Sequence, residues 1–383
     1  MRNFFLPNKS SYMPKSKSFV VFRDYQKRII WEKIFIQIEM ELRKKQIPLH
    51  IFSMDEYRRK GVKRFTREYL SKKNVSGFNL YVSMKVLYIS IEMYVRKAIS
   101  IKNIFFIVSK AIKLLDFLES KQCDSILMVR GFKEPEILVA AKALGIQIYA
   151  MQHGDYYHKE YKKNIPNEGM VDTIFLWDDA SKEYCLKQFA NLCEFIVPGP
   201  LWAISYNGLT RKRSHYDVAL YLSSSDAHEK FVMNEVVKLT SISSIVIPHP
   251  SPVVISPNLS CLDRSFFDVG SLDLSKEQPL VAIVFDSTVV QELVHVGVPV
   301  LYVESIKGSN TANKPSTLCF NTNKLDRLGA KLALLLSQDA TRGEVVSKQR
   351  AELGLATLDG QLVLRNVLSK LLADRAVMRS QSS

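Results

Sequence analysis

The sequence predicts an α/β protein that folds into two domains, each built on an open parallel sheet. Short apolar runs, typical of buried strands, alternate with stretches of helical periodicity in both halves of the chain. The length of 383 residues exceeds what one hydrophobic core usually organises. A break formed by Pro198-Gly199-Pro200 and the polar residues Asn207–Ser214 separates the two halves.

The first half shows repeated alternation of strands and helices. Its expected strands are 19–22, 49–52, 125–129, 146–151, 173–177 and 195–197, and its expected helices are 25–45, 134–144 and 180–189. A basic, helix-rich stretch precedes residue 120. Because single helices join neighbouring short strands, we expect the strands to run parallel.

The same alternation restarts after the break. Its expected strands are 217–222, 244–247, 280–285 and 300–303, its expected helices are 227–239 and 289–296, and three further helices follow at 324–337, 340–352 and 361–373. The sequence thus predicts an N-terminal domain over residues 1–200, a linker over 201–214, and a C-terminal domain with terminal helices over 215–383.

The excess positive charge lies in the first part of the chain. Residues 1–150 carry 29 Lys and Arg against 13 Asp and Glu, whereas the remainder carries 24 against 25. This asymmetry indicates an anionic partner for the N-terminal half. The densest basic run is interleaved with Tyr57, Phe65 and Tyr69, as in a segment at an anionic membrane surface, and contains Arg58, Arg59, Lys60, Lys63 and Arg64.

A solvated basic helix face is the alternative explanation of that run. The sequence contains no zinc-ligand spacing and no RNA-recognition signature, so we expect no nucleic acid partner. Residues 1–18 do not resemble a secretory signal, and charged residues interrupt the longest apolar stretches. Five scattered cysteines suit a reducing compartment. We therefore expect a cytoplasmic protein, peripheral to the inner face of the plasma membrane.

Polar residues follow two expected strands of the first domain, where open α/β sheets bind their ligands. Gln152-His153-Gly154-Asp155 comes directly after one strand, and His153 or Asp155 is a candidate general base for a hydroxyl group. A loop hydrogen bond is the plain alternative for His153. Arg130 and Gly131 follow another strand, and they are weaker candidates for contact with an acceptor.

Two further groups follow strands of the second domain. His249 lies between prolines, and with Pro250 it could meet a nucleotide phosphate, or simply form a rigid turn. Ser287 and Thr288 stand where a helix begins, which places hydroxyls and free N–H groups at the positive end of its dipole. Plain helix capping is the alternative. Glu292, one turn later, is a candidate acceptor for ribose hydroxyls.

The order of these motifs resembles that of bacterial surface-polysaccharide transferases with the GT-B fold. Histidine-glycine, then histidine-proline, then a serine-threonine pair with a downstream glutamate is similar to the histidine-proline sialyltransferases and to teichoic-acid and capsule transferases. The resemblance implies two Rossmann-like domains with an interdomain cleft and a helical C-terminal tail. It also implies that His249, Ser287 and Thr288 contact the nucleotide phosphate of the donor.

One departure concerns the base. The sialyltransferases usually carry an acidic pair followed by glycine, whereas this chain has Asp178-Asp179-Ala180, which we interpret mainly as a helix N-cap. The base is therefore expected at His153 or Asp155. No Asp-x-Asp motif is present, and no metal or cofactor is predicted. His295, within a helix, is expected to pack rather than to react.

These features predict an inverting, metal-independent glycosyltransferase that moves a sugar from a nucleotide donor to a glycan or lipid-linked acceptor of capsule, O-antigen or lipopolysaccharide. The histidine-proline match favours a CMP-linked acidic sugar, and a uridine donor stays open. Three alternatives also stay open: a polyol-phosphate transferase of the teichoic-acid type, a nucleotide-sugar 2-epimerase, and a non-catalytic assembly partner that kept the fold.

Overall fold

The computed structural model describes residues 18–23, 29–53, 57, 80–95, 101–129, 134–152, 170–189, 193–206, 212–222, 242–248, 268–285, 287–304, 314–321 and 327–380. These residues form two compact units. The first comprises Met1–Leu201 and Gln361–Ser383, and the second comprises Trp202–Gly360.

A six-stranded parallel sheet forms the centre of the first unit, in the order β2-β1-β3-β4-β5-β6. Its strands are β1 (Ser18–Arg23), β2 (Leu49–Ser53), β3 (Cys123–Val129), β4 (Gln147–Met151), β5 (Thr173–Phe175) and β6 (Glu194–Ile196). The middle strands are buried on both faces, as a parallel sheet covered by helices requires. This arrangement confirms the parallel sheet expected from the alternating pattern.

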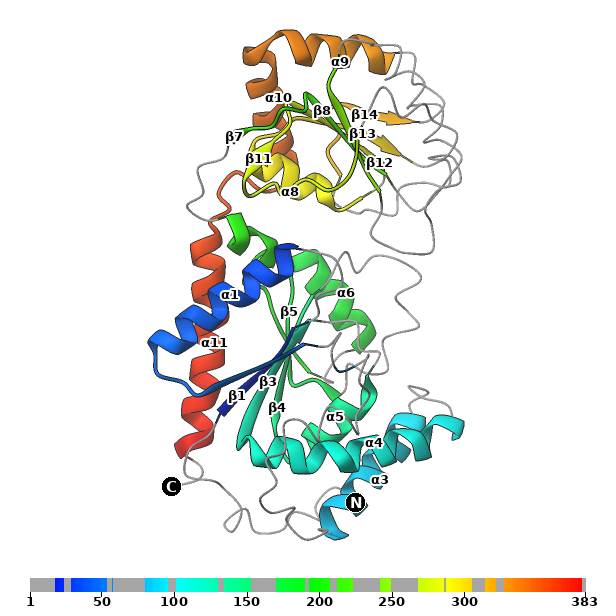
Figure 1. Ribbon diagram of the computed structural model, residues 1–383, viewed down its shortest axis with the longest axis vertical. Coiled ribbons are helices and arrows are strands. Elements are labelled where there is room, and N and C mark those ends of the chain that lie inside the picture. The colour runs from blue at the N-terminus through cyan, green and yellow to red at the C-terminus, as the bar shows by residue number, and fades with distance from the viewer. Residues whose placement is uncertain are drawn as a thin grey trace. The chain divides into compact units, whose positions relative to one another are not determined.

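Helices cover both faces of this sheet. They are α1 (Ile29–Lys44), α3 (Leu80–Val95), α4 (Ile101–Ser120), α5 (Pro135–Ala143), α6 (Asp179–Phe189) and α11 (Gly360–Ser380). In Figure 1, α3, α4 and α5 lie together on the unit. Val20, Phe22 and Phe52 point into the core shared with α4 and α5. Alternate residues of the strands face the other way, because side chains alternate along a strand.

The C-terminal helix α11 belongs to the first unit. The Tyr149 hydroxyl on β4 donates a 3.0 Å hydrogen bond to Asp374 on α11. Lys370 bridges Glu194 and Asp374 at 2.6 and 2.7 Å. The sequence predicts instead that these terminal residues belong to the C-terminal domain. Periodicity identifies the apolar face of a helix but not the sheet that buries it, so the assignment followed chain order alone.

The second unit also contains a six-stranded parallel sheet, in the order β10-β9-β8-β12-β13-β14. Its strands are β8 (Val218–Tyr221), β9 (Ser244–Ile247), β10 (Asp268–Val269), β12 (Val281–Phe285), β13 (Val300–Glu304) and β14 (Cys319–Asn321). Two short strands, β7 (Lys212–Arg213) and β11 (Glu277–Gln278), pair beside it. The helices are α8 (Val289–Val296), α9 (Leu328–Ser337) and α10 (Asp339–Glu352).

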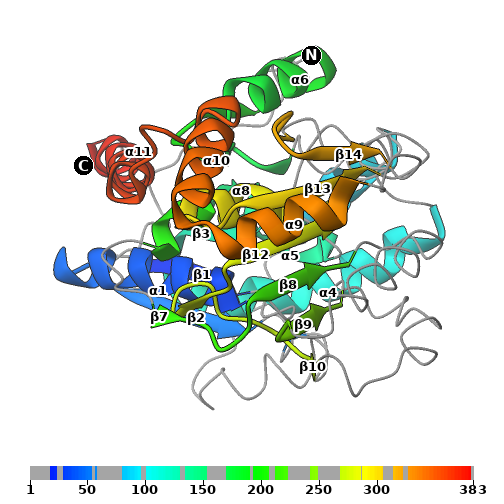
Figure 2. The same cartoon turned by 90° about the horizontal axis from the view of Figure 1, so that it is seen from above.

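Two of these helices have distinct places against the sheet. Leu328, Leu332 and Leu335 of α9 join the core formed by one face of β8, β12 and β13, and Figure 2 shows α9 lying over β12 and β13. Helix α8 follows β12 directly and buries Val290, Leu293 and Val294 outside that core cluster.

Residues expected to form a linker are instead structured. Leu201–Tyr206 form a short 3-10 helix, η4, whose side chains are almost fully buried. Lys212 and Arg213 form β7. Proline and glycine marked the chain break correctly, but Trp202 and Tyr206 carry apolar rings that fold into the second unit. Tyr57 is likewise buried and donates a 2.8 Å hydrogen bond to Glu136, so it does not take part in a surface segment as expected.

Most expected elements are present with ends shifted by a few residues. The expected helix 227–239 lies outside the described residues. Among the described residues, no helix combines the length and apolar composition needed to cross a membrane.

Candidate functional site

The second sheet has a topological switch point between β8 and β12. The chain runs from β8 outward to β9, then returns to the opposite side of β8 as β12 and continues to β13. All these strands are parallel, so their carboxyl ends lie at one edge. In open α/β sheets, ligands bind at the carboxyl edge beside such a switch point. Ser287 and Thr288 lie at this edge, between β12 and α8.

Helix α8 begins with weakly capped N–H groups. Thr288 occupies the N-cap position without a side-chain hydrogen bond to the helix. Ser287 Oγ accepts only a long 3.4 Å hydrogen bond from the Val289 N–H. The Val290 and Gln291 N–H groups donate to the carbonyl oxygens of Ser287 and Thr288 at 3.3 and 3.2 Å. This helix end therefore favours an anionic group such as phosphate mainly through the positive end of its dipole and the two hydroxyls. The expectation of hydroxyls at a helix start is confirmed in position.

Glu292 is anchored one turn further along α8. The hydroxyl of Tyr206, on η4, donates a 3.0 Å hydrogen bond to Glu292 Oε2. Burial, followed by the charge and hydrogen bond of Glu292, raises the pKa of Tyr206 well above its ordinary value. Tyr206 therefore stays protonated and remains a donor. A carboxylate can accept about four hydrogen bonds, so this contact holds Glu292 in place without exhausting its acceptor capacity.

A second buried tyrosine lies at the end of β8. Tyr221 is opposite Val284 of β12 in the sheet. Within the described part of the chain, its hydroxyl has no hydrogen-bond partner, although its oxygen is buried. Burial, and to a smaller extent the negative charge of Glu292, raises the pKa of Tyr221. A buried donor of this kind usually binds a polar atom, so Tyr221 belongs to the candidate site.

Aromatic contacts hold η4 against α8. The ring of His295 lies 5.2 Å from that of Trp202 and 6.2 Å from that of Tyr206, measured between ring centroids. His295 is therefore packed, as the sequence analysis expected. Neither Tyr206 nor Tyr221 was identified from sequence. The i, i+4 spacing of Trp202 and Tyr206 was the available signal, because it predicts an amphipathic helical turn where a linker was expected.

Gln152 forms two side-chain hydrogen bonds at the carboxyl edge of the first sheet. Its Oε1 accepts a 2.7 Å hydrogen bond from the Trp177 N–H, and its Nε2 donates to Ser181 Oγ at 3.3 Å. Asp178 Oδ1 accepts a 2.6 Å hydrogen bond from the Ser181 N–H, which confirms Asp178 as the N-cap of α6. These contacts fix the point at which the chain leaves β4 toward His153.

The remaining candidates lie outside the described residues. Their chain positions follow the carboxyl ends of β3, β4 and β9, or fall in the basic run. They are Arg130, Gly131, His153, Asp155, His249, Pro250, Arg58, Arg59, Lys60, Lys63 and Arg64. Among the described residues, no group of three or more His, Cys, Asp or Glu side chains forms a metal site.

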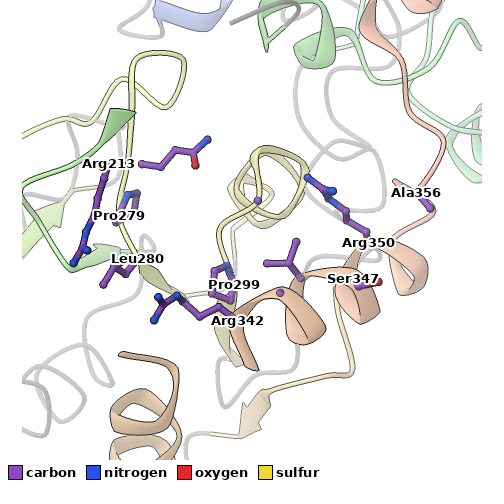
Figure 3. A pocket seen from close by; sticks show the side chains of 12 residues that line it. Arg213, Pro279, Leu280, Pro299, Arg342, Ser347, Arg350 and Ala356 are labelled. Carbon is purple, nitrogen blue, oxygen red and sulfur yellow. The ribbon is translucent and has the colours of Figure 1, made fainter. Parts of the chain in front are cut away.

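A cavity of about 570 Å³ lies elsewhere in the second unit, near the amino ends of β12 and β13. Figure 3 shows Arg213, Arg342 and Arg350 around it. Arg350 donates to the carbonyl oxygens of Val294 and His295 at 3.1 and 2.7 Å, and Arg213 pairs with Asp217 at 3.1 Å. Arg350 and Arg213 are therefore engaged in contacts within the fold. The cavity lies at the edge of the sheet opposite the candidate site.

Comparisons with known proteins reveal similarity in structure only. No family model matches the chain, and no curated protein matches it by sequence. A putative UDP-N-acetylglucosamine 2-epimerase from Listeria monocytogenes is 11% identical, with 94% of this chain and 97% of that chain covered and a TM-score of 0.59. The chain has the GT-B fold.

Two other solved structures cover the chain to a similar extent. S. aureus MnaA, in a co-structure with UDP, is 12% identical, with 90% of this chain and 98% of that chain covered and a TM-score of 0.50. A glycosyltransferase from Rickettsia africae is 13% identical, with 93% and 98% covered and a TM-score of 0.49. The two parallel sheets and the C-terminal helices of this chain are the two Rossmann-like units and helical tail expected from the sequence.

Proposed function

We propose that this chain is a glycosyltransferase that takes a sugar from a nucleotide donor and adds it to a glycan or lipid-linked acceptor of a bacterial surface polysaccharide. The observation that carries the proposal is the start of α8. There a weakly capped helix N-terminus, Ser287 and Thr288 meet the switch point of a parallel sheet, and Glu292 stands one turn away. A phosphate and a ribose fit this pair of features.

The donor occupies the second unit in this proposal. The N-terminus of α8, with Ser287 and Thr288, binds the nucleotide phosphate, and His249 and Pro250 contribute from the turn after β9. Glu292 accepts hydrogen bonds from the ribose hydroxyls while Tyr206 holds its carboxylate. The buried hydroxyl of Tyr221 supplies a further donor. The dipole of α8 and the hydroxyl of Tyr221 thereby oppose the negative charge of the leaving nucleotide without a metal ion.

The acceptor belongs to the first, basic unit. His153 or Asp155 removes the proton from an acceptor hydroxyl, and its oxygen forms a bond to the anomeric carbon of the donor sugar. The bond between that carbon and the nucleotide phosphate breaks, and the phosphate leaves with the bonding electrons. Arg130 and Gly131 contact the acceptor. The basic run from Arg58 to Arg64 favours binding of the enzyme to the anionic inner face of the plasma membrane.

Two nucleotides are the leading candidates for the carrier of the donor sugar. The histidine-proline resemblance favours a CMP-linked acidic sugar, whereas the MnaA structure with the same fold contains UDP. Both place a ribose next to a phosphate, which is the chemistry that Glu292 and α8 are arranged to bind.

A nucleotide-sugar 2-epimerase is the second candidate. The TM-score of 0.59 to the Listeria protein favours it, whereas the positive charge of residues 1–150 favours an enzyme with an anionic acceptor surface. The two reactions are easily separated, because an epimerase converts UDP-N-acetylglucosamine without an acceptor and leaves the sugar on its nucleotide.

The test is a thermal-shift titration of the full chain with UDP, CMP, GDP and the 2′-deoxy forms of each. A ligand that binds the folded state raises the melting temperature by mass action. We expect one ribonucleotide to stabilise the protein and its 2′-deoxy form to bind about tenfold more weakly, because a hydrogen bond to a charged acceptor contributes roughly 1.5–3 kcal/mol.

The variants Glu292→Gln and Tyr206→Phe should each reduce that preference for ribose. The matched controls are Glu344→Gln, an exposed carboxylate on α10, and Tyr216→Phe, which removes a hydroxyl bonded to Asp268 at the surface. Neither control should alter nucleotide binding. Equal binding of ribo- and deoxyribonucleotides would refute the role of Glu292, and no response to any nucleotide would refute the proposed function.

A further inference from the structure

Helix α3 is apolar on two opposite faces. Val86 and Met93 are buried in the core of the first unit, and Val82 and Ile89 pack against it. A second apolar stripe lies on the outside and repeats at intervals of three and four residues, which places its members on one side of a helix. It comprises Tyr81, Met84, Tyr88, Ile91 and Val95, with Tyr88 68% and Val95 70% exposed.

The start of α4 extends this exposed stripe. Ile101 follows Val95 by only six positions, and α3 and α4 pack side by side (Figure 1). Phe105 is 81% and Phe106 60% exposed. Large aromatic and aliphatic side chains in one cluster are unusual on a soluble surface and usually indicate a binding face. We call this cluster, with the stripe on α3, the α3–α4 apolar surface.

The charge of this part of the sequence indicates the kind of partner. Residues 54–113 contain 14 Lys and Arg against 4 Asp and Glu. The Lys85 ammonium lies 5.3 Å from the centroid of the Tyr81 ring. Lys110 lies 4.0 Å from that of Phe106 and also pairs with Glu136 at 3.3 Å. Long basic side chains beside aromatic rings suit the boundary between headgroups and acyl chains of an anionic bilayer.

A second copy of the chain fits this surface poorly. Self-association would bring two strongly basic segments together and would be opposed by their repulsion. An anionic bilayer instead attracts the basic residues and accepts the apolar ones. We propose that the α3–α4 apolar surface inserts into the headgroup region of an anionic bilayer. This inference adds a contact surface to the membrane part of the proposed function and does not depend on nucleotide binding.

The first experiment is flotation of the full-length protein with phosphatidylcholine vesicles that contain about one third phosphatidylglycerol. The triple variant Tyr88→Ser, Val95→Ser and Phe105→Ser should bind at least about tenfold more weakly, because three large apolar contacts with the bilayer are lost. The matched control changes Leu186, Leu362 and Val377 to Ser. These residues are 44–54% exposed in α6 and α11, and this control should float like the wild type.

A second measurement locates the contact. In Phe105→Trp, the introduced indole should shift its fluorescence to the blue on vesicle addition and be quenched by brominated lipid, whereas in Leu362→Trp it should not. Flotation of the triple variant equal to that of the wild type would overturn the proposal. The proposal would also be overturned if the wild type did not bind vesicles but formed a concentration-dependent dimer that the triple variant did not form. A positive flotation result without any nucleotide response would uphold this surface while refuting the proposed function.

Discussion

Single residues in this protein acquire their roles from their neighbours. Glu292 is recognisable in the sequence as an acidic residue one turn into a helix, but only the structure shows that Tyr206 anchors it. Asp178 was correctly identified as a helix cap because capping depends on residues close in sequence. Tyr206 and Tyr221 carry no motif, and they reach the site through contacts that span 86 residues or cross between strands.

Glu352, at the end of α10, shows how such contacts set a pKa. Its carboxylate accepts hydrogen bonds from the backbone and hydroxyl groups of Ser316 and Thr317, at 2.6–3.0 Å. Burial acts to raise the pKa of Glu352, but these four hydrogen bonds together lower it below the ordinary value of 4.5. A carboxyl group with a lowered pKa stabilises the folded state when it is ionised.

We therefore expect the stabilisation from Glu352 to be complete above pH 4.5 and to disappear as pH falls through its lowered pKa. Glu352→Gln should cost roughly 1 kcal/mol at neutral pH, since the site is largely open to solvent. The difference from the wild type should shrink in acid. Urea unfolding between about pH 7 and pH 3 measures it. Thr317→Val should remove part of the same difference, and a pH-independent difference would contradict the assignment.

At the scale of elements, periodicity proved a reliable guide for the described helices and the longer strands. Apolar spacing and caps act within a few residues, so they can be read locally. The strands β7, β10 and β11 were missed because two residues do not establish a period, and the three-residue strand β14 was missed as well. They form only where a neighbouring strand offers hydrogen-bond partners.

Glycine has opposite effects on helix stability at two positions. Gly297 ends α8 with a φ of 96°, and its N–H donates a 3.1 Å hydrogen bond to the Val294 carbonyl. Gly343 lies inside α10, and an added Cβ there would meet nothing within 4 Å. A positive φ is strained for any residue with a Cβ, whereas a helix interior favours alanine over glycine.

Gly297→Ala should therefore destabilise the protein by about 1–2 kcal/mol, and Gly343→Ala should stabilise it by about 0.5–1 kcal/mol. Chemical unfolding of the two variants beside the wild type provides the measurement. Changes of the same sign would show that the left-handed turn after α8 is not required by the fold.

At the scale of the whole molecule, α11 returns the end of the chain to the first unit. Besides its contacts with Tyr149 and Glu194, it places Arg375 3.5 Å from Asp124 of β3, with both side chains less than 10% exposed. Breaking a buried ion pair is costly because the remaining charge stays in a poorly solvating environment. This pair thus links the last helix to the centre of the first sheet.

Arg375→Leu should lower the free energy of unfolding by about 3–5 kcal/mol. Combining it with Asp124→Leu should recover much of that loss, because no buried charge remains. Arg365→Leu, at an exposed position of α11, is the control and should have little effect. Additive losses in the double variant, measured by urea unfolding, would exclude coupling between the two side chains.

The sequence by itself determined the fold class, the positions of most helices and strands, and the sheet edge at which Ser287 and Thr288 lie. These follow from apolar periodicity, helix caps and the parallel order of strands, all of which are local or follow from chain order. Only the tertiary structure decided that residues 361–380 pack on the first unit, that Trp202–Tyr206 join the second, and that Tyr206 anchors Glu292. A helix's pattern states how much apolar surface it must bury, but not against which partner, and that choice depends on packing across the whole chain.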